Sequence, residues 1–385
     1  MRVAFVMPGV GVVHRGAEAF VVEIAAALAR RPGVEVTLFC RGEAGLLGLP
    51  GLSRHRVRAV PRDARWLNAA YGTTRFGRKV LDTLFLDPLS VEWYTAALSA
   101  FPALRRGGYD VLVMEGGLVG AWLARWLRRR RGVGFVDVAH GLDPKWEGAF
   151  ARQRPDRVVA FTQAAAAMIR GRAPRATVAV IPHGVDLAVF HPGVEPADAG
   201  LPAPVVMVAG AVDEHKQAAR ALDAVARLAD AGRPASLLVL GDGPLADDLD
   251  RRAAERLPTG RYRRLAVPRA EMPRWYAAAD VFTLPSRSES FGLGYLEAMA
   301  CGRPCVAPDD AVRRAVIGDA GLYADPGDAE SYAEALAAAL DRDWGELPRR
   351  RAERFPFSAT VEAWAGLLAA VAAEHGRPAA AGAAP

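Results

Sequence analysis

Short apolar runs alternate along almost the whole chain with segments in which apolar residues recur at helical spacing. The first run, RVAFVM at residues 2–7, predicts a buried strand, and AEAFVVEIAAALARR at residues 17–31 predicts a helix with Phe20, Ile24 and Leu28 on one face. The same alternation restarts with PVVMVAG at residues 204–210. Strands separated by helices pair in parallel, so the pattern predicts an α/β fold of doubly wound sheets covered by helices on both faces.

The alternation is interrupted at residues 191–204, HPGVEPADAGLPAP, where Pro, Gly and Asp predict an interdomain linker. We therefore expect two domains, at residues 1–190 and 200–350. Residues 62–105 fit the pattern least well, since they are aromatic-rich and helical in character, as expected of an insertion that shapes a binding cleft. The low-complexity tail, residues 376–385, is expected to be disordered.

Composition places the chain among soluble globular proteins. The 385 residues suit two domains, and 51% are apolar and 24% charged. A net charge of +6 favours anionic ligands or an anionic surface. Three cysteines without framework spacing indicate a reducing compartment. The first apolar run is too short for a signal peptide, and no run approaches the ~18 residues of a membrane helix, so a cytoplasmic protein is expected.

The first loop, PGVGVVHRGAEAF, lies where a dinucleotide fingerprint would be found. It offers Gly9-x-Gly11-x-x-His14, without the third glycine, and no acidic residue follows the second strand at Cys40. These departures argue against a dinucleotide site. Gly16 directly precedes the helix, where free amides favour an anion, although it is equally well explained as a loop glycine needed for backbone geometry.

The stretch ESFGLGYLEAMACG, residues 289–302, predicts a loop followed by a helix. Amides at the helix start, near Phe291, Gly292 and Leu293, would be free to bind a phosphate. Glu297 lies about 7 Å further along the helix axis, near enough for an adjoining ribose. Glu289 precedes the helix and should meet a neutral hydroxylated group. Together these positions outline a nucleotide sugar; the alternative is one capping acid and one exposed helix acid.

This stretch resembles the signature of retaining glycosyltransferases of the GT-B fold, family 4 (glycosyl transferases group 1). Further segments resemble that family in the same order: RGAEAFVVEIAAAL, DVAHGLDP, VIPHGVDLAVFHP, LLVLGDGPL, MPRWYAAADVFTLPSRSE, GDAGLYADPGDAESYAEAL and FPFSATVEAWAGLLAAV. The resemblance covers nearly the whole chain. Residues 42–105 match poorly, and they lie where the family's acceptor site is expected.

The resemblance implies two Rossmann-like domains facing a central cleft, with a last helix at residues 355–374 that packs back on the N-terminal domain. It implies that Glu289 contacts the donor sugar, Glu297 the ribose, Lys216 the diphosphate, and that His140 faces the donor sugar. Taken alone, His140 would be a packed or capping residue and Lys216 a surface lysine. The implied reaction is metal-independent, retaining transfer from a nucleoside diphosphate sugar to a glycan, a lipid-linked sugar or a small metabolite.

Three positions depart from the family pattern. Ala211 stands where an arginine of the diphosphate site is usual, and Arg269 or Arg287 could replace that cation. Arg15 stands where the first loop usually has a glycine, and Ala315 where a glutamate is common. Ala211 keeps open the alternative of a non-catalytic nucleotide-sugar-binding partner subunit. Another GT-B nucleotide-sugar enzyme, such as an epimerase or a phosphorylase-like enzyme, is a second alternative.

The segment WLARWLRRRRG, residues 122–132, combines Trp122 and Trp126 with four consecutive arginines. It predicts either an ordinary amphipathic helix with a solvated end or attachment to an anionic membrane, as a lipid-linked acceptor would require. No Asp-x-Asp metal motif is placed to hold a divalent cation, and no nucleic-acid motif accompanies the positive charge. We therefore expect no cofactor beyond the donor, no metal, and no nucleic-acid partner.

Overall fold

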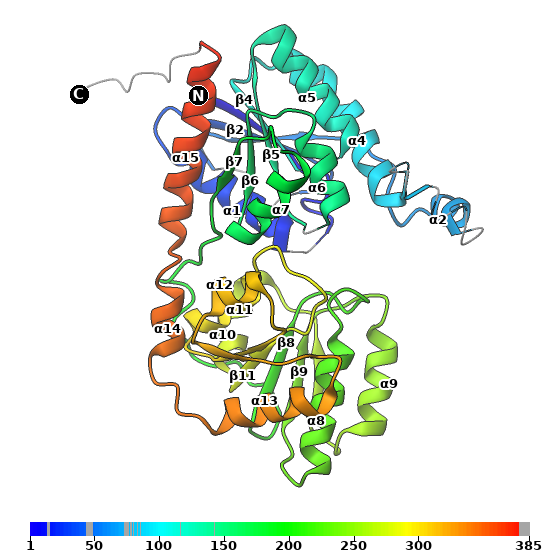
Figure 1. Ribbon diagram of the computed structural model, residues 1–385, viewed down its shortest axis with the longest axis vertical. Coiled ribbons are helices and arrows are strands. Elements are labelled where there is room, and N and C mark those ends of the chain that lie inside the picture. The colour runs from blue at the N-terminus through cyan, green and yellow to red at the C-terminus, as the bar shows by residue number, and fades with distance from the viewer. Residues whose placement is uncertain are drawn as a thin grey trace. The chain divides into compact units, whose positions relative to one another are not determined.

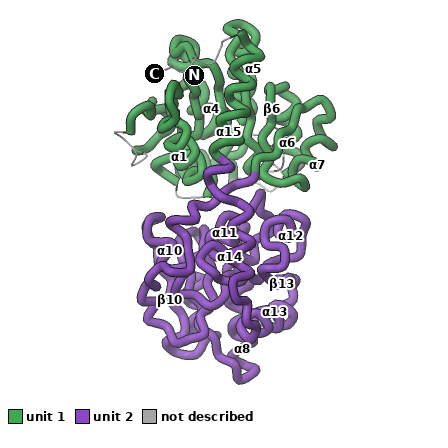
Figure 2. Tube along the Cα trace, turned by 90° about the vertical axis from the view of Figure 1, so that its left-hand side faces the viewer, with its two compact units in different colours: residues 1–181, 361–385 green, residues 182–360 purple. Residues whose placement is uncertain are grey.

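The computed structural model describes the chain except residues 14–15, 44–48, 73–76, 78, 80, 83, 85, 116, 142 and 377–385. The expected disordered tail therefore lies outside the described residues, apart from Gly376. The chain forms two compact units (Figure 2). The first contains Met1–Ile181 and the chain from Val361 on, and the second contains Pro182–Thr360.

The first unit is built on a seven-stranded sheet in the order β3-β2-β1-β4-β5-β6-β7, with every pairing of its strands parallel (Figure 1). Its strands are β1 (Arg2–Val6), β2 (Glu35–Cys40), β3 (Leu52–Arg56), β4 (Val111–Met114), β5 (Gly134–Val138), β6 (Arg157–Ala160) and β7 (Val178–Val180). Its helices include α1 (Gly16–Ala29), α2 (Arg65–Gly72), α4 (Pro88–Arg106), α5 (Leu118–Arg131), α6 (Pro144–Ala151) and α7 (Gln163–Arg172).

The last helix, α15 (Phe357–Glu374), packs on the first unit through its apolar face. Trp364 is completely buried, with its ring 6.2 Å from that of Phe5 and 6.1 Å from that of Phe20. By length and composition alone α15 could cross a membrane, so the expectation that no segment meets these requirements is wrong for this helix. A core helix of a soluble protein meets the same criteria, and 33% of α15 is buried, including Trp364.

The second unit is built on a six-stranded parallel sheet in the order β10-β9-β8-β11-β12-β13. Its strands are β8 (Val205–Ala209), β9 (Ser236–Leu240), β10 (Tyr262–Leu265), β11 (Val281–Thr283), β12 (Cys305–Ala307) and β13 (Gly321–Tyr323). Its helices are α8 (Ala218–Asp230), α9 (Ala246–Arg256), α10 (Met272–Ala277) after a 3₁₀ turn (Arg269–Glu271), α11 (Leu293–Ala300), α12 (Ala311–Ile317), α13 (Ala329–Asp341) and α14 (Leu347–Ala352).

The strand order of each sheet reverses at its first strand. β1 lies between β2 and β4, and β8 lies between β9 and β11. Loops leaving the carboxyl ends of strands diverge at such a switch point, which is where ligands of doubly wound sheets bind. Lys216 follows β8 and Glu289 follows β11, so the topology brings these two sequence-predicted residues to one place. The predicted α/β class with two parallel sheets is confirmed.

Candidate active site

The loops after β8 and β11 are joined by an ion pair. Lys216 Nζ lies 2.7 Å from Glu289 Oε1, and the two side chains are 26% and 11% exposed. The sequence assigned these residues to different parts of the donor, the diphosphate and the sugar. The structure adds that they are direct neighbours, so a phosphate bound at Lys216 would lie next to whatever group Glu289 holds.

The start of α11 supplies backbone amides beside this pair. Gly292 caps the helix with φ of 90°, a conformation that favours glycine, and a Cβ there would lie 2.7 Å from the Tyr295 ring. Phe291 is buried and packs edge-on against His183 and Phe355, with centroids 5.3 and 5.6 Å away. The Phe291 side chain therefore anchors the loop, and Leu293 begins the helix whose first amides lack intrahelical partners.

Glu297 is buried inside the unit, not exposed on α11. It is 3% exposed, accepts a 2.9 Å hydrogen bond from the Tyr276 hydroxyl, and lies 2.5 Å from Arg269 Nη1. Burial, with the adjacent charge of Glu297, raises the pKa of Tyr276 well above its ordinary value, so Tyr276 remains a hydrogen-bond donor. The alternative of an exposed helix acid is wrong. A carboxylate oxygen has more than one lone pair, so one bonded partner does not use up its capacity as an acceptor.

The two arginines considered as substitutes for the cation missing at Ala211 are differently placed. Arg269 is engaged with Glu297. Arg287 is 63% exposed and donates a 3.1 Å hydrogen bond to the carbonyl of Glu214. Neither is bonded to Glu289 or Lys216 in the part of the chain that the structure describes.

Arg313, on α12, was missed by sequence reasoning. It is 1% exposed and donates hydrogen bonds to the carbonyl and hydroxyl oxygens of Ser286, at 2.6 and 2.7 Å. The hydroxyl of Ser286 in turn donates to Glu289 Oε1 at 2.6 Å. A signal was present, because Arg313 occupies the helix position four residues before the buried Ile317, where an apolar residue is expected.

In the first unit, His140 follows β5 and is held by Glu115, which follows β4. His140 Nε2 and Glu115 Oε2 form a short hydrogen bond, and Glu115 is 1% exposed. Burial alone would lower the pKa of His140, but the carboxylates of Glu115, Glu18 and Asp137 raise it above its ordinary value. His140 therefore carries positive charge to higher pH than a free histidine.

Two further buried acids lie close to His140 and were not predicted. Burial and the charge of Glu115 raise the pKa of Asp137 to about 7. Burial and the charge of Asp137 raise the pKa of Glu147 well above its usual range. Glu147 accepts a 2.8 Å hydrogen bond from the amide of Gly141, the residue after His140, and so fixes this turn.

The first loop is described only in part. Gly16 is exposed and is the first residue of α1, so its amide is available at that helix start. The preceding His14 and Arg15 lie outside the described residues.

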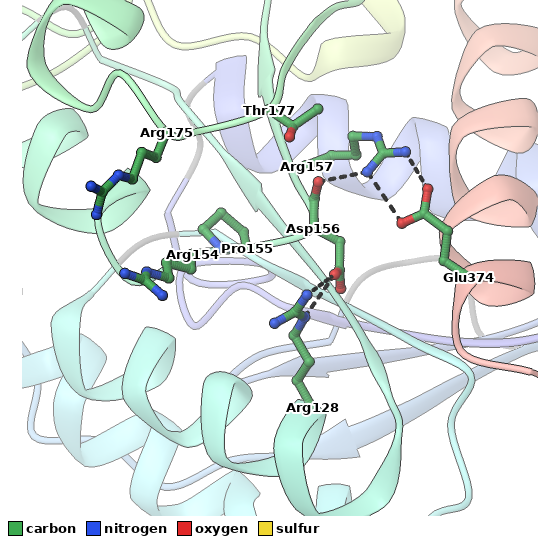
Figure 3. Close-up of a pocket in the computed structure, with 8 residues that line it drawn as sticks. All are labelled: Arg128, Arg154, Pro155, Asp156, Arg157, Arg175, Thr177 and Glu374. Atoms are coloured by element: carbon green, nitrogen blue, oxygen red, sulfur yellow. Dashed lines mark hydrogen bonds and ion pairs between the residues drawn. The ribbon is translucent and has the colours of Figure 1, made fainter.

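A separate pocket of the first unit lies at the amino-terminal ends of β6 and β7 (Figure 3). Arg128 contacts Asp156 at 2.6 Å, and Arg157 pairs with Glu374. The full lining is Arg128, Arg154, Pro155, Asp156, Arg157, Arg175, Thr177 and Glu374. Four arginines against two carboxylates leave this pocket with a net positive charge.

Comparison with known proteins agrees with these features. The family model "Glycosyltransferase Family 4" matches residues 14–189, and "Glycosyl transferases group 1" matches residues 203–342. The chain is 30% identical to the GDP-mannose-dependent alpha-(1-6)-phosphatidylinositol dimannoside mannosyltransferase of Mycobacterium tuberculosis, over 77% of each chain. It is 30% identical to D-inositol 3-phosphate glycosyltransferase 2 of Catenulispora acidiphila, over 91% of this chain and 88% of that protein.

Solved structures give the same fold at lower identity. Sucrose-phosphate synthase from Thermosynechococcus elongatus superposes with a TM-score of 0.77 at 21% identity, over 97% of this chain and 99% of that one. Anabaena HepE, solved with UDP and glucose, gives 0.72 at 18% identity, over 96% and 100%. With both halves matched and relatives at 30% identity along most of its length, the chain belongs to the group 1 glycosyltransferases of the GT-B fold.

Proposed function

We propose that this glycosyltransferase moves a sugar from a nucleoside diphosphate sugar to a hydroxyl acceptor, with retention at the anomeric carbon and without a metal ion. The observation that carries the proposal is the Lys216–Glu289 ion pair beside the start of α11. It provides a cation, a hydroxyl-binding carboxylate and free amides within one small region. The names of two relatives, one dependent on GDP-mannose and one solved with UDP-glucose, support a nucleotide-sugar donor.

The second unit would bind the donor in three parts. Glu297, held by Tyr276 and Arg269, would accept hydrogen bonds from the ribose hydroxyls. The diphosphate would lie against the first amides of α11 and Lys216, and Glu289 would accept from a hydroxyl of the sugar. When the diphosphate leaves, negative charge develops on its oxygens, and Lys216 and the helix dipole stabilise that charge.

Residues of the first unit would complete the reaction. His140 would orient the donor sugar, with Glu115 fixing its ring and the carboxylates around it keeping its charge. The amide of Gly16 would add a donor to the phosphate. We propose that the acceptor hydroxyl attacks the face from which the diphosphate departs and that the departing phosphate takes its proton. No covalent bond to Glu289 forms in this scheme.

The names of two relatives support a proposal for the acceptor class. One is a phosphatidylinositol dimannoside mannosyltransferase and the other an inositol 3-phosphate glycosyltransferase. We propose a polyhydroxylated acceptor of this kind, either free or lipid-linked. The acceptor would bind in the first unit.

A lipid-linked acceptor would require the protein to reach a membrane, and α5 offers a surface for that. Trp122 and Trp126 are 56% and 40% exposed on one side of α5, and Leu98 of α4 is 56% exposed. Arginines end α5, and the arginine-lined pocket in Figure 3 continues the positive charge. We propose peripheral attachment to an anionic membrane from the cytoplasmic side, through interfacial tryptophans and lipid phosphates.

Donor binding is tested by the melting temperature of the protein with a panel of nucleoside diphosphates and their sugars. One nucleoside should stabilise it by mass action.

The Glu297→Gln variant should bind that nucleoside diphosphate less tightly by about 1.5–3 kcal/mol in calorimetry, because hydrogen bonds from the ribose to a charged group are lost. Glu271→Gln, an exposed acid nearby, is the control. Equal affinity in Glu297→Gln and the parent would remove Glu297 from the site.

Leaving-group chemistry is tested by transfer in excess EDTA, followed by NMR of the product anomer. Lys216 and the amides of α11 already oppose the phosphate charge, so turnover should persist with chelator. The early product should keep the donor's anomeric configuration. Loss of turnover that magnesium or manganese restores, or an inverted product, would contradict the scheme.

Membrane attachment is tested by co-sedimentation with two kinds of vesicle, one of phosphatidylcholine alone and one that also contains about 30% anionic lipid. The anionic lipid gives the vesicle a negative surface potential, which attracts basic side chains. The parent should sediment with the anionic vesicles, and a Trp122→Ser, Trp126→Ser double variant should remain in solution. Val189→Ser, which changes an exposed apolar residue of the second unit, is the control. Equal sedimentation of parent and double variant would rule out this surface.

A further inference from the structure

Glu289 lies in a loop, and neither a helix nor a strand fixes its position. The loop runs from β11 to α11, residues 284–292. It is tied at its start by the Tyr295 hydroxyl, which donates to the carbonyl of Leu284 at 2.5 Å. His215 Nε2 contacts the carbonyl of Ser288 at 2.9 Å. These bonds hold the backbone, whereas the direction of the Glu289 carboxylate depends on its own side-chain partners.

Those partners form a directed chain of hydrogen bonds that begins at Arg313. The guanidinium donates to the Ser286 hydroxyl at 2.7 Å, and that hydroxyl has one hydrogen, which it donates to Glu289 Oε1 at 2.6 Å. Lys216 donates to the same oxygen at 2.7 Å. Successive bonds in one direction polarise and strengthen one another. Both bonds use Oε1. Among the described residues none donates a hydrogen bond to Oε2, which is therefore left to accept from a ligand.

Arg313 is itself held in one orientation. It pairs through Nη1 with Asp310, which also caps α12 by accepting from the amides of Val312 and Arg313 at 2.9 Å each. Burial lowers the pKa of Arg313, but Tyr295, Asp310 and Glu289 outweigh it and raise the pKa above its ordinary value. The guanidinium is therefore a fixed, permanent charge that points at the base of the Glu289 loop.

Stability alone accounts poorly for an arginine at this place. Its neighbours on the helix face, Val312, Val316 and Ile317, are apolar and buried. Arg313 Nε is buried without a hydrogen-bond partner among the described residues, which costs free energy. Replacing a buried charged group by an apolar side chain of similar volume is often neutral or stabilising. We therefore look for the role of Arg313 in the groups that its other two nitrogens bind, which are Asp310 and Ser286.

We propose that Arg313 is a positioning residue for the donor-sugar carboxylate: through Ser286 it sets the direction of Glu289 and leaves Oε2 free for the sugar. The proposal rests on the proposed function, in which Glu289 binds the sugar. It predicts an effect on turnover and little effect on the nucleotide, because Arg313 touches none of the groups assigned to the ribose or the diphosphate.

The test compares Arg313→Met, Arg313→Lys and Ser286→Ala with the parent, using UDP-glucose or GDP-mannose, whichever the parent turns over. Misplacing a reacting or orienting group by about 1 Å can cost on the order of 100-fold in rate. We expect kcat of Arg313→Met to fall by about that factor, with the affinity for the nucleoside diphosphate kept within about twofold. Arg313→Lys should recover part of the rate, since an ammonium can still donate to Ser286.

Arg314→Met is the matched control, because Arg314 is the next residue of the same helix, is 57% exposed and pairs with Asp309 away from the loop. It should leave kcat unchanged. Ser286→Ala removes the link without a large change of volume, so it tests the proposal even if Arg313→Met folds poorly. Glu289→Gln serves as the reference for loss of the carboxylate itself.

Crystal structures of the variants give a readout that needs no turnover: the Glu289 carboxylate should rotate away from its parental position in Ser286→Ala and Arg313→Met. Suppose that Glu289→Gln abolishes transfer. Unchanged kcat in both Ser286→Ala and Arg313→Met, or a Glu289 carboxylate that does not move, would then overturn the role of Arg313. Equal losses of turnover and nucleotide affinity would show a merely structural role. A parent protein that turns over neither donor would count against the proposed function for these donors.

Discussion

The site depends on one electrostatic constraint: a lysine and a glutamate from adjacent parallel strands are held within hydrogen-bond distance at the strands' carboxyl ends. Lys216 and Glu289 are 2.7 Å apart and mostly shielded from water. Each holds the other in place before a ligand arrives, because an unpaired charge in a largely buried position would be costly. A donor would have its phosphate and its sugar placed on either side of this pair, which couples recognition of the two parts.

The two units supply different electrostatic environments. In the second unit every acid of the site has a cation, since Arg269 faces Glu297, and Lys216 faces Glu289 while Arg313 acts on it through Ser286. In the first unit acids outnumber the cation, with Glu115 and Asp137 buried beside His140. The paired charges of the second unit suit a diphosphate. The excess of acids in the first unit suits neutral hydroxyls and a stabilised imidazolium.

Much of this could be predicted from the sequence, and the limits have physical causes. Strand and helix alternation predicts two parallel sheets, and the glycine-broken turn before α11 predicts free amides at a helix start. Periodicity assigns no partner in space, so the burial of Glu297 under Tyr276 and Arg269 and the Lys216–Glu289 contact required the fold. Arg313 was overlooked because charge suggests a solvated face, and only its position beside Ile317 contradicted that.

The central claim is that Lys216 binds the diphosphate while Glu289 binds the sugar, although the two are paired with each other. Calorimetric affinity for the nucleoside diphosphate, measured for Lys216→Met and Glu289→Gln, tests it most directly. The account predicts a loss of about 2–5 kcal/mol for Lys216→Met, because a phosphate loses its charged partner. It predicts equal or tighter binding for Glu289→Gln, since a negative charge beside the phosphate is removed and Lys216 is released. Parental affinity in Lys216→Met, or weaker binding in Glu289→Gln, would contradict the account.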